Sequence, residues 1–514
     1  MTIDFKNLPS ASQWNKIGVR PRHGINIPLA SLKTKQSSGI GEFSDLIPLI
    51  DWCHDVGFEV IQLLPLNDSG TDPSPYSALS SCALHPIYLS LQHLPGNPST
   101  PDASHLNDLP RVSYLEVLSL KLNFLHGYCN EKGPAIVKSK EFKDFLNQNW
   151  LVPYALFKVL KDKLQHTPWM SWPHELKTPD FKKLEAEHAQ EILFYLLLQF
   201  LCHQQLTEVK NYAHSKGILL KGDIPILISP DSADAWFKPE RFNFTLSAGA
   251  PPDAYNSEGQ NWGFPLFNWD DLKHEDFSWW KDRLKVASNY YDLYRIDHVV
   301  GFFRIWAVPL NHPAKEGKFL PENPALWVPQ GKEILLMMLG ASQMLPIAED
   351  LGTIPPSVRT TLTELGICGT KVIRWERKYD QGKEFIPFKD YPILSMTTVS
   401  THDSETLQLW WQDPFEGAKE FCSFKHWPYS PDLSYEHRLE ILKDAHHTPS
   451  LFHINLLPEY LALFPELVSS HPDDERINIP GKILPTNWTY RLHVPLEEIS
   501  RHEHLKKAIK AILN

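Results

Sequence analysis

The chain has 514 residues and a formal net charge of −11, and its composition is 42% apolar and 22% charged. This balance is typical of a globular protein, and the negative charge argues against binding to a nucleic-acid backbone, which requires clustered positive charge. No apolar run approaches the length of about 18 residues that suggests a membrane span, and the polar N-terminus lacks the apolar core of a secretory signal. We therefore expect a cytoplasmic protein with no nucleic-acid or membrane partner.

Short, nearly continuous apolar runs recur along the chain and end in polar or small residues. Runs of this kind are typical of parallel strands that are covered on both faces. We predict strands that begin near Gly24, Phe58, Gly217, Tyr291, Met344, Gly369 and Met396. Together they indicate an α/β fold.

The segments between the predicted strands contain helices and long loops. The clearest helix runs from about Glu185 to Tyr212, where apolar residues recur with a period near 3.6. We predict a helix-rich insertion at about 91–205 and a substrate-loop region, rich in proline, asparagine and aspartate, at about 230–290. Because no internal repeat or flexible linker separates these parts, residues 1–514 are predicted to form a single catalytic domain.

A doubly wound sheet is the main alternative to a barrel. The sequence SSGIGEFSD contains Gly39 and Gly41, but Phe43 and Ser44 follow where a dinucleotide-binding motif has its third glycine. We therefore interpret this segment as a turn. Seven or eight strands spread along the whole chain fit a (β/α)8 TIM barrel with helical and loop insertions better, and that fold places its chemistry at the carboxyl ends of the strands.

Three of the predicted strand ends carry a carboxyl group beside other polar residues, at Asp297, Glu349 and Asp403. Alternation along a strand puts Arg295 and Asp297 on one face, where the arginine favours the ionised carboxylate that a nucleophile requires. The apolar residues before Glu349 should raise its pKa and keep it protonated as a general acid. Two carboxyl groups in such different environments indicate cleavage of a glycosidic bond.

A structural role is the alternative for each of these acids. A single acidic residue at a strand end is more often a helix cap or a member of an ion pair than a catalyst. Asp350, beside Glu349, is a good candidate for that role. The crowding of Arg295, His298 and His402 beside the strand ends favours catalysis, because independent caps do not need these neighbours.

Motifs for other chemistries are absent from the sequence. No HExxH, GxSxG or Walker-type loop occurs, and the six cysteines are scattered, which predicts reduced and mostly buried thiols. His446 and His447 are adjacent and cannot both face one metal from a regular helix, so we interpret them as solvated surface residues. We therefore predict neither a metal nor a cofactor.

Several short motifs together resemble one enzyme family. RIDH at Arg295–His298, AEDLG at Ala348–Gly352 and THD at Thr401–Asp403 resemble, in order and spacing, conserved regions of the α-amylase superfamily. The resemblance is narrower to the 4-α-glucanotransferases called amylomaltases or disproportionating enzymes. Further matching segments span nearly the whole chain and read SPYSALSSCALHPIYLSL, GDIPI, DSADAW, GAPPD, GQNWG and RINIPG.

The resemblance implies a role for each residue of the site. Asp297 is the expected nucleophile, Glu349 the general acid/base, and Asp403 the group that binds sugar hydroxyls beside the reacting carbon. Trp262 is expected on a loop over the cleft, where it can stack on glucose and shield the intermediate from water. The expected substrate-binding residues are Tyr76, Asp223, Asp253, Trp262, Arg295, His402 and Asn478.

The resemblance also implies the activity. The expected enzyme transfers an α-1,4-glucan segment to the 4-hydroxyl of glucose or a maltooligosaccharide by a retaining double displacement, in maltose metabolism or glycogen recycling. A retaining α-glucan hydrolase and a non-catalytic glucan-binding protein are the alternatives, and the retention of all three acids argues against the second. The chain departs from the family pattern at Thr71 and Ala254, where aromatic residues are common, which affects only the outer glucan-binding sites.

Overall fold

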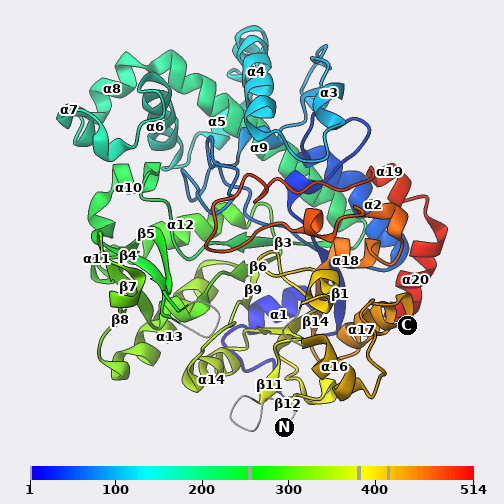
Figure 1. Ribbon diagram of the computed structural model, residues 1–514. Coiled ribbons are helices and arrows are strands. Elements are labelled where there is room, and N and C mark those ends of the chain that lie inside the picture. The colour runs from blue at the N-terminus through cyan, green and yellow to red at the C-terminus, as the bar shows by residue number, and fades with distance from the viewer. Residues whose placement is uncertain (1–2, 253–256, 379–383, 414–416) are drawn as a thin grey trace.

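The computed structural model describes residues 3–252, 257–378, 384–413 and 417–514, and a barrel of eight parallel strands forms its centre (Figure 1). The strand order is β10-β13-β14-β1-β2-β3-β6-β9, and a bridge between Ile347 and Cys368 joins the two ends of this sheet. The predicted (β/α)8 class is therefore confirmed. The barrel strands are β1 (Arg22–Asn26), β2 (Val60–Gln62), β3 (Leu219–Ile224), β6 (Leu293–Ile296), β9 (Leu345–Ala348), β10 (Gly369–Val372), β13 (Ser395–Thr398) and β14 (Phe452–Leu456).

The sequence predicted every barrel strand except β14. This strand reads Phe-His-Ile-Asn-Leu, so its apolar residues alternate with His453 and Asn455 instead of forming a continuous run. Both polar side chains are nonetheless buried, because the whole strand is enclosed. β14 pairs with β1 on one side and with β13 on the other, and it therefore joins the first strand of the chain to the later ones.

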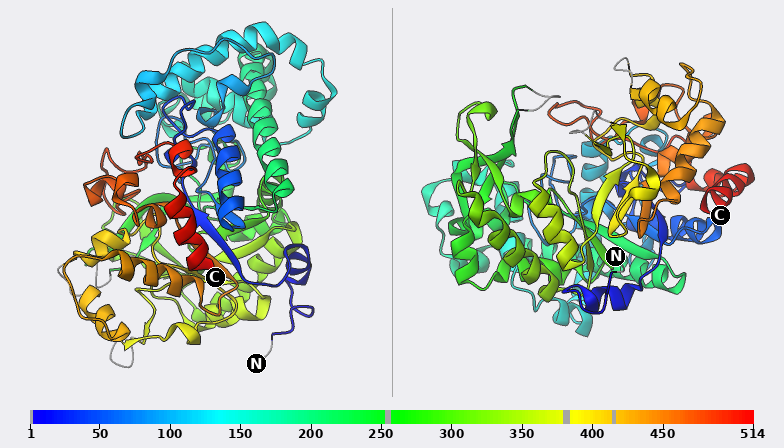
Figure 2. Two further views of the ribbon diagram at one scale, coloured as in Figure 1. Left: turned by 90° about the vertical axis from the view of Figure 1, so that its right-hand side faces the viewer. Right: turned by 90° about the horizontal axis from the view of Figure 1, so that it is seen from below.

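Helices surround the barrel (Figures 1 and 2). The helix predicted at about Glu185–Tyr212 is confirmed as α9 (Ala189–Ser215). The helices before it, drawn in cyan and blue-green, lie above the barrel in the left view of Figure 2. They fall between β2 and β3 and are α3 (Ser104–Asn107), α4 (Tyr114–Ile136), α5 (Lys140–Phe145), α6 (Leu151–Lys163), α7 (His174–Lys177) and α8 (Phe181–Glu187).

The remaining helices follow the other strands or connect them. The division of the chain into one domain with two insertions stays a prediction. These helices are α1 (Ala11–Ile17), α2 (Leu46–Val56), α10 (Ala233–Phe237), α11 (Trp269–His274), α12 (Ser278–Ala287), α13 (Trp327–Ala341), α14 (Pro356–Leu365), α15 (Leu407–Trp411), α16 (Gly417–Lys425), α17 (Tyr435–His446), α18 (Leu457–Leu461), α19 (Leu496–Ile499) and α20 (Glu503–Leu513).

A second sheet lies partly within the predicted loop region at about 230–290. β4 (Phe242–Ala250) and β5 (Gln260–Phe267) form an antiparallel pair, which β7 (Ile305–Pro309) and β8 (Lys318–Leu320) extend in the order β5-β4-β7-β8. The expectation of irregular structure is therefore wrong for β4 and β5. Their pairing contains register shifts, which break the regular alternation that reveals a strand in a sequence. A further short pair consists of β11 (Arg377–Lys378) and β12 (Glu384–Phe385).

Polar side chains fill part of the barrel interior. Lys221 on β3 is fully buried, and its Nζ lies 2.8 Å from Oε1 of Gln62 and 3.0 Å from Sδ of Met396. Burial, together with the nearby charge of Arg295, lowers the pKa of Lys221 to about 7. Asp223 lies two residues further along β3, so the polar interior leads toward the carboxyl ends of the strands.

Two expectations drawn from the sequence concern the cysteines and the possibility of a membrane span. All six cysteines are buried and free, as predicted. Among the described residues, no helix combines the length and the apolar character needed to cross a membrane.

Gly24 permits a close approach between β1 and β2, and this contact can be tested. It pairs with Val60, and a Cβ at Gly24 would lie 2.3 Å from the Val60 carbonyl oxygen. We predict that Gly24→Ala lowers the free energy of unfolding by about 1–3 kcal/mol, because the strands must move apart. Gly127→Ala is the control, since a Cβ on this α4 residue meets no atom within 4 Å.

The control substitution should stabilise the protein by about 0.5–1 kcal/mol, because alanine favours a helix over glycine. Urea unfolding of both variants measures the difference. A Gly24→Ala variant as stable as the wild type would contradict the close strand contact.

Candidate active site

A single guanidinium, that of Arg295, contacts three carboxyl groups at the carboxyl end of the barrel. Its Nη1 lies 2.9 Å from Oδ2 of Asp223 and 2.8 Å from Oδ1 of Asp297. Its Nη2 lies 3.7 Å from Oε2 of Glu349. Burial acts to lower the pKa of Arg295, but the surrounding carboxylates outweigh it and raise that pKa well above its ordinary value. Arg295 is therefore a fixed positive charge at the centre of this group.

The strand register brings these four residues together. Asp223 on β3 pairs with Arg295 on β6, and Asp297 directly follows β6. Arg295 and Asp297 are two residues apart and lie on the same side of the chain, as alternation predicts. Glu349 directly follows β9, the other neighbour of β6. Three adjacent strands thus supply one charged cluster.

Two backbone N–H groups hold Glu349 in place. Those of His298 and Leu351 donate to its carboxyl oxygens at 2.8 and 3.0 Å. His298 has a left-handed backbone with φ of 43°, at the turn after β6. Burial raises the pKa of Glu349 to about 7; Arg295 and the N–H groups oppose this rise, and Asp297 adds to it. Glu349 can therefore exchange a proton near neutral pH.

Asp403 lies in the loop after β13, and its neighbours favour the carboxylate. Nε2 of His402 lies 3.3 Å from Oδ2 of Asp403, and Nδ2 of Asn478 donates to Oδ1 at 2.7 Å. Burial acts to raise the pKa of Asp403, but His402 and Asn478 outweigh it and hold this pKa well below its ordinary value. The side chain is 42% exposed, so it can still accept hydrogen bonds from a ligand.

Tyr76 connects the two halves of the site. Its hydroxyl donates to Oδ2 of Asp223 at 2.9 Å and lies 2.9 Å from Nε2 of His402. Because the hydroxyl has one proton, the histidine must donate in the second contact. The Tyr76 ring also stacks on His402 and contacts Trp488, with centroids 5.6 and 5.5 Å apart. Polar contacts therefore run from the Arg295 cluster to His402.

Apart from Asp223, these residues line one cavity of about 540 Å³, a volume within the range of about 300–1,000 Å³ that is usual for ligand sites. Sugar rings have apolar faces and polar edges, and a cavity with both kinds of surface suits them. The aromatic residues of its wall are Tyr76, Trp262, Phe264, Trp375 and Trp488.

Trp262 reaches this cavity from β5, so the expectation that it lies on a loop is wrong. Its ring meets the ring of His298 edge to face at 4.9 Å, and its Nε1 donates to Oε1 of Gln260 at 3.0 Å. The two residues before it, Gln260 and Asn261, pair with Ala250 and Gly249 of β4, so the backbone is held on that side of Trp262. Asp253 and Ala254, by contrast, lie outside the described residues.

The structure brings together all the predicted site residues that it describes. Asp223 contacts the cluster through Arg295 and Tyr76, and the others line the cavity. Asp350 has the structural role expected of it, since it pairs with Nε of Arg359 at 2.9 Å and accepts the N–H of Thr370.

Sequence reasoning missed several cavity residues. Asn26 and Gln62 also line the cavity, and they are the last residues of β1 and β2. A search for amides at strand ends, as well as acids, would have found them. Trp488 lies in an irregular segment with no strand or helix pattern, so no sequence signal identified it.

Comparison with known proteins gives a consistent result. Residues 27–497 match the 4-alpha-glucanotransferase family. A 4-alpha-glucanotransferase of Chlamydia pneumoniae is 49% identical over 99% of this chain and 98% of its own length. One of Chlamydia trachomatis is 44% identical over 97% of this chain and 96% of its own.

A solved structure has the same fold. The amylomaltase from Streptococcus agalactiae in complex with acarbose superposes with a TM-score of 0.81 at 24% identity, and the match covers 96% of this chain and 98% of that one. The family match and the two relatives each extend over nearly the whole chain. The chain therefore belongs to the 4-alpha-glucanotransferase family.

Proposed function

We propose that this 4-alpha-glucanotransferase cleaves an α-1,4-glucan, holds the donor segment on Asp297, and transfers it to the 4-hydroxyl of glucose or a maltooligosaccharide. The observation that carries the proposal is the contact of one guanidinium with both Asp297 and Glu349. Retaining glycoside chemistry requires two neighbouring carboxyl groups, one as nucleophile and one as acid. The pKa of about 7 at Glu349 supports the second role.

In the first step, a carboxylate oxygen of Asp297 attacks C1 of the donor glucose while Glu349 gives its proton to the leaving glycosidic oxygen. The bond from C1 to the leaving sugar breaks as the bond to Asp297 forms. Asp297 loses its negative charge and Glu349 gains one. Because Arg295 contacts both, the number of negative charges around it stays constant during the step.

In the second step, Glu349 acts as the base. It takes the proton of the acceptor 4-hydroxyl, whose oxygen attacks C1 and displaces Asp297. Two displacements at C1 give net retention. Between the steps, the N–H groups of His298 and Leu351 stabilise the Glu349 carboxylate, since each already donates to it.

The other polar groups are assigned to sugar binding. Asp403 is assigned to the sugar hydroxyls, because charged acceptors form stronger bonds with hydroxyls than neutral ones do and the pKa of Asp403 is held well below its ordinary value. Its contacts with His402 and Asn478 fix its position. The further binding residues are Tyr76, Asp223, Asp253, Trp262 and Arg295, of which Asp253 rests on the family resemblance alone.

A retaining α-glucan hydrolase is the second candidate. It needs the same two carboxyl groups and differs only in whether water or sugar reaches the intermediate first. Membership of a transferase family favours a sugar over water as the acceptor. We also propose a cytoplasmic setting in maltose or glycogen metabolism, which six buried free cysteines support.

Maltotriose distinguishes the candidates, with Asp297→Asn as the test of the nucleophile. We expect the wild type to form both longer and shorter oligosaccharides, whereas a hydrolase forms glucose and maltose only. Asp297→Asn keeps the shape of the side chain but cannot attack, so turnover should fall at least about 10³-fold. Asp55→Asn, an exposed carboxylate on α2, is the control and should retain full activity.

Chromatography of the products measures both outcomes. Substantial transfer by pure Asp297→Asn would remove this residue from the nucleophile's role. Products of hydrolysis alone from the wild type would make the second candidate correct.

The protonation of Glu349 sets a pH dependence. Activity in the first step requires the acid form, so kcat/KM should fall as the pH rises above about 7. Glu349→Gln should lose most of the activity and this alkaline decrease. A variant that kept the full pH profile would show that another group is the acid.

Stability gives an independent check of the same pKa. The folded-state pKa of about 7 lies above the ordinary 4.5, so the native state holds a proton that the unfolded chain has lost between these values. Stability should therefore fall as the pH rises from about 4.5 to 7, and this contribution should be absent in Glu349→Gln. Chemical unfolding of both proteins across that range measures it.

Trp262 is expected to limit hydrolysis. The intermediate faces water at about 55 M against millimolar sugar, so transfer requires that the closed site excludes water. Trp262→Ala should raise the ratio of glucose released by hydrolysis to oligosaccharide formed by transfer. Trp306→Ala is the control, because Trp306 is a half-buried tryptophan of the same sheet that is not part of the cavity wall. An unchanged ratio in Trp262→Ala would assign this residue to packing only.

A further inference from the structure

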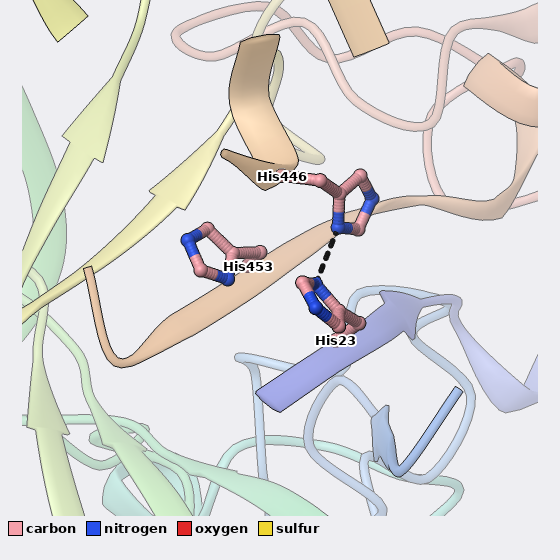
Figure 3. A group of neighbouring side chains, drawn as sticks. All are labelled: His23, His446 and His453. Carbon is pink, nitrogen blue, oxygen red and sulfur yellow. Dashed lines mark hydrogen bonds between the residues drawn. The ribbon is translucent and has the colours of Figure 1, made fainter. Parts of the chain in front are cut away.

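Three histidines from two distant parts of the chain meet near the amino ends of two barrel strands (Figure 3). His23 is the second residue of β1, His453 is the second residue of β14, and the two are paired in register. His446 is the last residue of α17. The ring centroid of His23 lies 4.9 Å from that of His446 and 5.0 Å from that of His453.

The cluster is largely buried. His446 and His453 are 2% and 1% exposed, and His23 is half-buried. The interpretation of His446 as a solvated surface residue is therefore wrong. Its neighbour His447 points elsewhere and contacts the carbonyl oxygen of Ile512 through Nε2, because consecutive residues at a helix end face different directions.

His453 has a buried lone pair with no donor. Its Nε2 lies 3.1 Å from the carbonyl oxygen of Thr448. A carbonyl only accepts, so Nε2 carries the ring proton and Nδ1 is an acceptor. The backbone of Arg22 is near this ring, but no group meets the buried Nδ1 in hydrogen-bond geometry. A buried acceptor without a partner is unfavourable, and it has the electronic form of a metal ligand.

The other two histidines share one proton. Nδ1 of His23 lies 2.8 Å from Nδ1 of His446, so one nitrogen donates and the other accepts. On its far side, Nε2 of His446 lies 2.5 Å from the hydroxyl oxygen of Tyr460. Nδ2 of Asn455 lies 3.2 Å from the same Nε2 and donates to the Tyr460 oxygen at 2.9 Å. In the tautomer in which Nε2 donates a hydrogen bond to the Tyr460 oxygen, Nδ1 of His446 has a lone pair available to a metal.

We propose that His23, His446 and His453 form a binding site for a divalent transition metal of the Zn²⁺ type. Neutral imidazoles bind Zn²⁺, Co²⁺, Ni²⁺ or Cu²⁺ and not the oxygen-seeking Mg²⁺ or Ca²⁺. The three candidate ligand nitrogens lie within 4.8 Å of one another. Tetrahedral Zn–N bonds of about 2.1 Å place nitrogens about 3.4 Å apart, so ring shifts of about 1 Å suffice.

The surroundings supply what such a site needs. Metal-bound histidines usually donate their other N–H to an oxygen, and Thr448 and Tyr460 offer these oxygens to His453 and His446. The half-buried His23 leaves one side open for entry and for water as the fourth ligand. The nearby cations Arg20 and Arg22 are both paired with Glu59, which reduces their repulsion of a metal ion.

The proposed site is separate from the catalytic cavity. Asn26 lines that cavity and lies three residues after His23 on β1, which corresponds to about 10 Å along a strand. A metal here would connect β1, the first barrel strand, to α17 and to β14, the last barrel strand. His23 and His446 are 423 positions apart in the sequence. Its role would be to stabilise the barrel and not to take part in transfer.

The test uses full-length protein without a histidine tag, stripped with EDTA and titrated with Co²⁺ and then Zn²⁺. We expect one equivalent of Co²⁺ to produce the intense visible absorption of a tetrahedral site, and Zn²⁺ to displace it. Zn²⁺ should raise the melting temperature, whereas Mg²⁺ and Ca²⁺ should not. Transfer on maltotriose should be the same with and without metal.

Substitutions assign the ligands. His453→Gln and His23→Gln should each weaken Co²⁺ binding at least about tenfold while retaining transfer activity, which reports an intact fold. His447→Gln is the matched control and should bind as the wild type does. If His453→Gln does not fold, the half-buried His23→Gln still decides the question.

Two results would overturn the proposal. One is the absence of a tetrahedral Co²⁺ spectrum in the wild type. The other is unchanged affinity in the folded ligand variants, or equal loss in His447→Gln. In either case the three rings are a hydrogen-bonded part of the barrel only.

Discussion

The buried guanidinium of Arg295 is the group on which the rest of the active site depends. Removing a charge from water costs several kcal/mol, and in a barrel interior it is offset only by well-placed partners. Asp223 and Asp297 contact one nitrogen of this guanidinium, and Glu349 lies beside the other. Their positions are mutually dependent, because each of the three carboxyl groups contacts the same guanidinium.

This arrangement fits the two displacements of the proposed mechanism. In that mechanism negative charge moves from Asp297 to Glu349 and back, and both carboxyl groups lie beside the same cation. The protein therefore needs no large rearrangement of dipoles as the charge moves, which is the usual basis of electrostatic catalysis. The antiparallel sheet that carries Trp262 is attached to the barrel through β7, which follows β6 after a short turn. Trp262 of the cavity wall and the charged cluster thus belong to connected parts of the fold.

The first and last barrel strands, β1 and β14, lie side by side and carry polar residues along their length. β1 supplies His23 near its amino end and Asn26 at its carboxyl end, and β14 lies beside it over the whole length of β1. On β14, Asn455 accepts the N–H of Val399 and lies 3.2 Å from His446. The polar residues that interrupt the apolar run of β14, and so prevented its prediction, are therefore the ones that bond it to its surroundings.

The sequence by itself determined where most barrel strands lie and that acids stand at their ends, because burial on both faces produces continuous apolar runs and alternation assigns each side chain a face. It did not determine which distant residues meet. Tyr76 reaches Asp223 across 147 positions and His402 across 326, and these contacts exist only after the barrel closes. The sequence predicted the raised pKa of Glu349 from the apolar residues before it, but it assigned no protonation state to Asp403. Glu349 and Asp403 both follow buried strands, yet the pKa of Glu349 is raised and that of Asp403 is lowered. Burial dominates at Glu349, whereas His402 and Asn478 outweigh it at Asp403, and Asn478 comes from 75 positions away. The local sequence determines which side chain is present, but the charges and hydrogen-bond donors that the fold places around it determine its protonation state.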